Sequence, residues 1–69
     1  MPLSMANAGE TVRIQRVGGK AETRQFLGNL GFVAGGEAKV ITVTDGNLIV
    51  QIKESRVAIS REMANKIMV

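Results

Sequence analysis

The chain has 69 residues, no cysteine, no histidine and a formal net charge of +3 from nine basic and six acidic residues. These absences exclude disulfides, cysteine- or histidine-ligated zinc, thiol nucleophiles and histidine-based acid–base catalysis. A chain of this length has room for one domain, whose core supplies about 3–5 kcal/mol of net stability. We therefore predict a single domain over residues 1–69, no enzyme activity, and no catalytic, cofactor-binding or metal-binding residues.

Nothing in the chain resembles a membrane-spanning or targeting segment. No apolar run approaches the length of about 18 residues that a spanning helix needs. Residues 1–8 lack the basic start and long apolar run of a signal peptide. We expect a cytoplasmic protein with no direct membrane insertion.

The first regular element is predicted at residues 11–17. Val12 and Ile14 alternate there with polar residues, and this period of two indicates a half-buried strand. A Gly-Gly pair at residues 18–19 ends the strand, because glycine adopts turn conformations without steric cost.

Residues 21–30 predict a helix with one apolar stripe. The stripe consists of Phe26, Leu27 and Leu30. Gly31 suits the left-handed position that follows a helix, and Phe32 then folds back onto Leu27 in a Schellman ending. We therefore expect the helix to stop at Leu30.

The second half of the chain predicts short strands joined by tight turns. Residues 37–45 form one strand with a bend after Val40, because the apolar face changes there. Asp45-Gly46 is a strong hairpin signal, and residues 48–52 alternate most clearly of all. A tight turn is predicted at Glu54-Ser55, followed by a strand over residues 56–59.

The C-terminal segment predicts a helical turn and a last strand. Ser60 is a good N-cap for a short turn that runs through Ala64, and residues 67–69 then return as a strand that closes the sheet. The fold class is mainly β, with about five strands around one short helix. A small closed or nearly closed barrel satisfies this pattern, because closure removes exposed strand edges.

Several segments, in this order, resemble the FeoA core domain. Leu27–Gly35 (L-G-N-L-G-F-V-A-G) is similar to the family's helix ending, and Asp45–Val50 to its hairpin. Ser55–Ala64 and Ile67–Val69 are similar to its last strand, helical turn and end. The likeness covers roughly residues 3–69.

Three positions depart from the family pattern. Ala34 stands where proline is usual, Phe26 where arginine or lysine is frequent, and Gly28 where leucine is frequent. The last two alter the surface of the helix, which is where a partner contact is expected to differ.

The resemblance implies an SH3-like barrel that assists bacterial ferrous-iron uptake without being an enzyme. It also implies a protein partner, FeoB, the membrane GTPase that moves ferrous iron. The same domain ends some iron- and manganese-dependent repressors, but Met1 precedes it directly here, so we expect the free-standing form.

The expected contact surface for this partner is the helix and the turn after it. Its candidate residues are Arg24, Phe26, Leu30, Phe32 and Val33. Large apolar side chains beside charged ones are typical of protein interfaces. The alternative, in which the apolar members of this set fill the barrel core, stays open at this point, and so does weak self-association.

A small basic RNA-binding barrel is the competing hypothesis. The basic residues are scattered along the chain, and the two aromatic residues are both phenylalanine. Stacking platforms for bases are therefore nearly absent, and we expect no tight nucleic-acid binding.

Overall fold

Two antiparallel sheets and three helical segments make up the structure, a computed structural model that describes residues 1–69. The helical segments are the 3-10 turn η1 (Leu3–Met5) and the helices α1 (Ala21–Leu30) and α2 (Arg61–Ala64). The strands are β1 (Thr11–Arg13), β2 (Arg16–Val17), β3 (Glu37–Val43), β4 (Asn47–Ile52), β5 (Ser55–Ser60) and β6 (Ile67–Met68). The predicted mainly β architecture is therefore observed, with six strands in place of about five.

The extra strand arises because the predicted strand over residues 11–17 divides into two. β1 pairs with β3, and β2 pairs with β6. Between them, the Ile14 amide donates to the Gly36 carbonyl at 2.8 Å and the Gln15 amide donates to the Met68 carbonyl at 2.7 Å. The chain thus changes partner between consecutive residues and carries the first sheet into the second.

The larger sheet has the strand order β1-β3-β4-β5. Its pairing shifts register between Val40 and Thr42, which confirms the bend predicted in β3. The hairpin predicted at Asp45-Gly46 joins β3 to β4. The following turn lies at Lys53-Glu54, one residue before the predicted position, and Lys53 adopts a φ of 54° there.

The core lies between the sheets and the helical segments. Alternate residues of β3 and β4 point into it, and so do Leu3 and Ile67 from the two ends of the chain. Its largest fully buried side chains are Phe32, Leu3, Ile14, Leu27, Leu48, Ile67, Val40 and Val50. The termini meet beside it, where the Val69 amide donates to the Met1 carbonyl at 2.7 Å.

Helix α1 ends as the sequence predicts. Gly31 has a φ of 110°, its amide donates to the Gly28 carbonyl, and the Phe32 amide donates to the Leu27 carbonyl at 3.0 Å. These are the two bonds of a Schellman motif. The predicted cap of α2 is also confirmed, because the Ser60 hydroxyl accepts from the Met63 amide at 3.1 Å.

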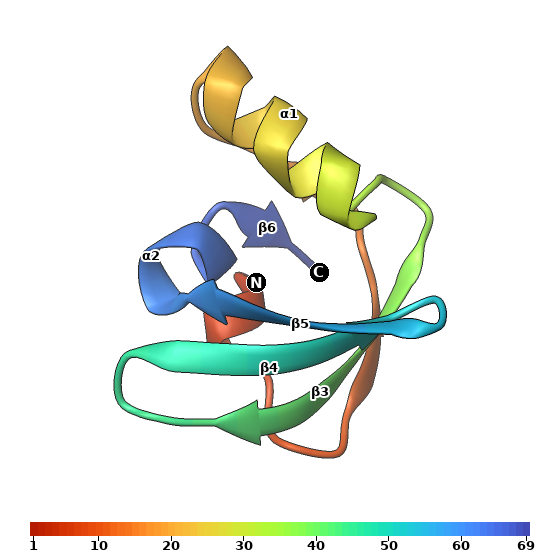
Figure 1. Ribbon diagram of the computed structural model, residues 1–69, viewed down its shortest axis with the longest axis vertical. Coiled ribbons are helices and arrows are strands. Elements are labelled where there is room, and N and C mark those ends of the chain that lie inside the picture. The colour runs from red at the N-terminus through yellow and green to blue at the C-terminus, as the bar shows by residue number, and fades with distance from the viewer.

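Helix α1 lies apart from the sheet that holds most of the core. In Figure 1 it occupies one end of the molecule, beyond β6 and α2, while β3, β4 and β5 lie at the other. Leu27 is its one buried residue. The remaining residues of α1 are half-buried or exposed, and this makes the helix the first place to look for a contact surface.

Candidate functional site

Large apolar side chains are exposed on α1 and in the segment that follows it. Phe26 is 51% exposed and Val33 is 48% exposed, although both are large apolar residues. Leu30, one helical turn after Phe26, is half-buried and packs against the core. The surface formed by Phe26, Leu30 and Val33 is called the α1 surface below.

The side chain of Arg24 lies exposed on the same helix, two residues before Phe26. Its Nη1 atom donates to the carbonyl oxygen of Gly19 at 3.0 Å. This bond ties the start of the helix to the loop before it, where Lys20 provides no side-chain cap. Arg24 therefore supplies an exposed positive charge on the helix that carries Phe26.

Phe32 does not belong to this surface. Its side chain is 1% exposed and is the largest buried side chain of the core, so its predicted role as a contact residue is corrected. The cause is the Schellman ending, which turns the residue after Gly31 back onto the helix. Four of the predicted contact residues remain at least partly exposed in the structure: Arg24, Phe26, Leu30 and Val33.

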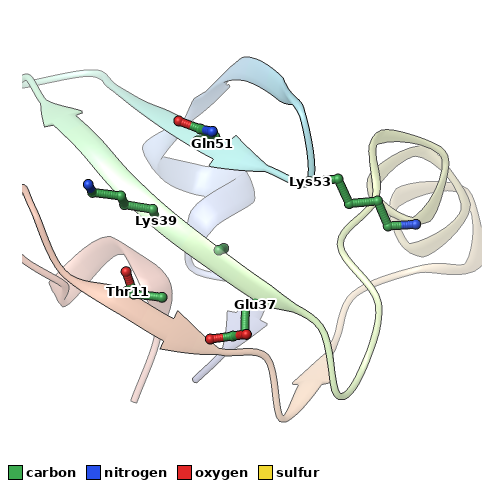
Figure 2. A pocket seen from close by; sticks show the side chains of 6 residues that line it. Thr11, Glu37, Lys39, Gln51 and Lys53 are labelled. Atoms are coloured by element: carbon green, nitrogen blue, oxygen red, sulfur yellow. The ribbon is translucent and has the colours of Figure 1, made fainter.

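Two surface hollows lie elsewhere. One, of about 350 Å³, lies on the outer side of the larger sheet and includes Lys39, Gln51 and Lys53. Figure 2 shows the two lysine side chains pointing away from each other, so their ammonium groups do not converge on one point. The other, of about 360 Å³, lies beside η1 and includes Met5, Val43 and Arg61. Neither hollow was predictable from local sequence patterns, because the lining residues are scattered along the chain.

The described residues contain no group of three or more His, Cys, Asp or Glu side chains that could hold a metal ion. Every buried side-chain nitrogen and oxygen has a hydrogen-bond partner. With Phe32 in the core, Phe26 is the one exposed aromatic ring. These observations leave the α1 surface as the best candidate site.

Comparison with known proteins identifies the family. The family model for the FeoA domain matches residues 1–69, which is the whole chain. The chain belongs to the FeoA family. A Methanocaldococcus jannaschii relative, designated a candidate Fe(2+) transport protein A, is 37% identical over 68 residues, which are 99% of this chain and 83% of the relative.

Solved structures of FeoA proteins share the fold. An iron uptake regulatory protein (FeoA) superposes with a TM-score of 0.92 at 24% identity, covering 97% of this chain and 91% of that one. An FeoA from Stenotrophomonas maltophilia, complexed with zinc and described as an SH3 domain protein, gives a TM-score of 0.86 at 23% identity. The match covers 99% of this chain and 87% of the Stenotrophomonas protein. The predicted SH3-like fold of this FeoA chain is therefore confirmed.

None of the helices in this FeoA structure is long and apolar enough to cross a membrane.

Proposed function

We propose that this FeoA chain is a non-enzymatic cytoplasmic accessory protein of ferrous-iron transport. In this proposal it docks on the cytoplasmic part of an FeoB-like membrane GTPase and alters the assembly or gating of that transporter. Membership of the FeoA family and the iron-transport designation of the archaeal relative support the iron-transport part. The docking part is supported by the α1 surface.

The observation that carries the docking proposal is the half-exposed ring of Phe26 on a helix that is anchored at one end. Single exposed apolar residues are ordinary on protein surfaces, but clusters of them beside charges are typical of interfaces. Here Phe26 and Leu30 lie one turn apart on α1, the exposed Val33 follows shortly after the helix, and Arg24 adds a charge on the same helix. Phenylalanine and arginine are both enriched at interfaces, where a few residues supply most of the binding energy.

The local structure lets α1 carry this surface without disturbing the core. Leu27 fixes the C-terminal half of the helix, and the buried Phe32 fixes the turn after it. A partner that covers Phe26 removes apolar surface from water, which is favourable at about 25 cal/mol per Å². The rest of the barrel does not have to move for this contact to form.

The composition supports a role as an accessory without catalysis. With neither histidine nor cysteine, the chain lacks the usual general base and the usual thiol nucleophile. Ferrous iron is cargo of the transporter in this proposal, and FeoA acts on the transporter by contact.

The test compares two apolar truncations of similar kind. Phe26→Ala removes the largest side chain of the α1 surface, and Met5→Ala removes an apolar side chain that is 67% exposed on η1. Binding of each variant to the cytoplasmic domain of the transporter is measured by calorimetry after thermal melting shows that both are folded. We expect Phe26→Ala to weaken binding by about 2 kcal/mol, roughly thirtyfold, and Met5→Ala to leave it unchanged.

Equal affinities for wild type, Phe26→Ala and Met5→Ala would place the docking site outside α1. Recovery of RNA, in place of a membrane GTPase, from a membrane-containing lysate would favour the nucleic-acid alternative over the adaptor.

A further inference from the structure

The larger sheet has a free edge at β5. This strand pairs with β4 on one side and has no strand on its other side. In Figure 1, β4 separates β5 from β3, so β5 forms the margin of the sheet. The smaller sheet does not close this margin, because β6 pairs with β2 and its Met68 bridges to Pro2.

The turn before β5 determines which of its backbone groups face this edge. Ile52 and Ser55 are partners across a two-residue turn. In such a hairpin the flanking pair is a hydrogen-bonded pair, and hydrogen-bonded pairs alternate along the ladder. Ser55, Val57 and Ile59 therefore direct their backbone groups at β4.

Arg56 and Ala58 consequently direct their N–H and C=O groups at the free edge. Neither residue takes part in any of the turn, loop or cap hydrogen bonds of the backbone. Both residues are exposed. The edge thus presents two donors and two acceptors at the spacing of an antiparallel strand, which is the arrangement that an added peptide strand recognises.

The side chains beside the edge indicate what such a strand must carry. On the outer side of the sheet, Arg56 follows Gln51 and Lys39 in one cross-strand row, which has two positive charges and no acidic residue. In the next row, Ala58 lies beside the part-exposed Ile49. On the inner side, Val57 is half-buried and packs against the core.

We propose that the free edge of β5 binds an extended segment of a partner protein as an added antiparallel strand. The residue of this segment opposite Arg56 is acidic, because it lies at the end of a cross-strand row that carries two positive charges and pairs with Arg56. The residue opposite Ala58 is apolar and covers Ile49, and the residue between them is apolar because it meets Val57. Read from N- to C-terminus, the segment is apolar, apolar, acidic.

This surface differs from the α1 surface and does not depend on the proposed docking through Phe26. Its test uses ¹⁵N-labelled FeoA and a short synthetic peptide with Val-Val-Glu at its centre. Addition of the peptide should shift the amide resonances of Arg56 and Ala58 and slow their hydrogen exchange. The Val57 amide, already bonded to β4 in this register, should keep its exchange rate. The same spectra show whether the resonances of Phe26 move.

Charge reversal provides the control. Arg56→Glu should lose binding to the glutamate peptide and gain binding to its Val-Val-Lys counterpart. Arg13→Glu, the same change on β1 at the opposite edge of the sheet, should leave both affinities unchanged.

Three results would overturn the proposal. One is equal binding of the glutamate and lysine peptides to wild type, and another is a set of peptide-induced shifts confined to α1. The third is a concentration-dependent shift of the β5 resonances without peptide, which would assign the edge to a second copy of the chain.

Discussion

Strand β4 and helix α1 each contain four apolar residues but have opposite relations to the core. β4 buries Leu48, Val50 and Ile52 out of six residues, and it is paired on both sides. Helix α1 buries Leu27 out of ten residues, with Leu30 half-buried behind it. Full burial of one leucine stabilises by about 1.5–3 kcal/mol, so the attachment of α1 is weak beside that of β4.

This difference separates the stability of the fold from its contact surface. A helix of ten residues is marginal by itself in water and depends on tertiary anchors. Here the anchors are Leu27 and the ending at Gly31 and Phe32, all toward one end. The N-terminal half of α1 buries no side chain; it is tied to the preceding loop by the Arg24 bond to Gly19, and it leads into Phe26.

The largest expected effect compares the two phenylalanines. Phe32→Ala should cost about 3–5 kcal/mol, because the ring is fully buried. That is as much as a core of this size supplies, so the variant should be largely unfolded at room temperature. Phe26→Ala should cost less than about 1 kcal/mol, because half of its ring is already in water. Urea denaturation of both variants measures the difference, and equal losses would mean that Phe26 belongs to the core.

The next effect tests the anchor at the helix end. Gly31→Val should destabilise by about 1–3 kcal/mol, because a β-branched residue resists a φ of 110°. A side chain there also meets Ile52, whose Cγ2 atom lies 3.4 Å from the new Cβ. Gly46→Val is the control, because Gly46 has no positive φ and open space around it. Thermal unfolding of both variants measures the cost, and a loss of a few tenths of a kcal/mol at Gly31 would show that the ending tolerates a side chain.

Local patterns predicted the elements whose signals lie within a few residues. The boundaries of α1 followed from its stripe and from Gly31, and the first hairpin followed from Asp45-Gly46. The division of β1 from β2 was not predictable in this way, because it depends on Met68 at the far end of the chain. The turn at Lys53-Glu54 was placed one residue too late, since no glycine or proline marks it.

The candidate site was predictable in part for a similar reason. The apolar stripe indicated Phe26 and Leu30, but periodicity alone does not say which side of a stripe faces water. The sequence did contain the signal that Phe32 is buried and not a contact residue, because a Schellman ending commits that position to contact with the helix. The free edge of β5 had no local signal, since an edge is defined by strand order in space.

The smallest effect concerns Gly28, in the last turn of the weakly attached helix. A Cβ built at this position meets no atom within 4 Å, so the glycine serves no close approach within the chain. Gly28→Ala should therefore stabilise α1 by about 0.5–1 kcal/mol, the usual gain in a helix interior. Gly35→Ala is the matched control, because its Cβ is equally unobstructed but its φ is 87°, so this variant should be destabilised.

Amide hydrogen exchange shows where this stabilisation acts. If α1 opens separately from the sheet, Gly28→Ala should slow exchange of the α1 amides roughly two- to fivefold and leave β4 unchanged. An equal slowing in β4 would show that helix and sheet unfold as one unit, and that α1 is not the less stable part. Faster exchange in α1 would mean that the helix needs the flexibility of glycine at this position. The last two outcomes differ in sign at α1, so one measurement separates all three.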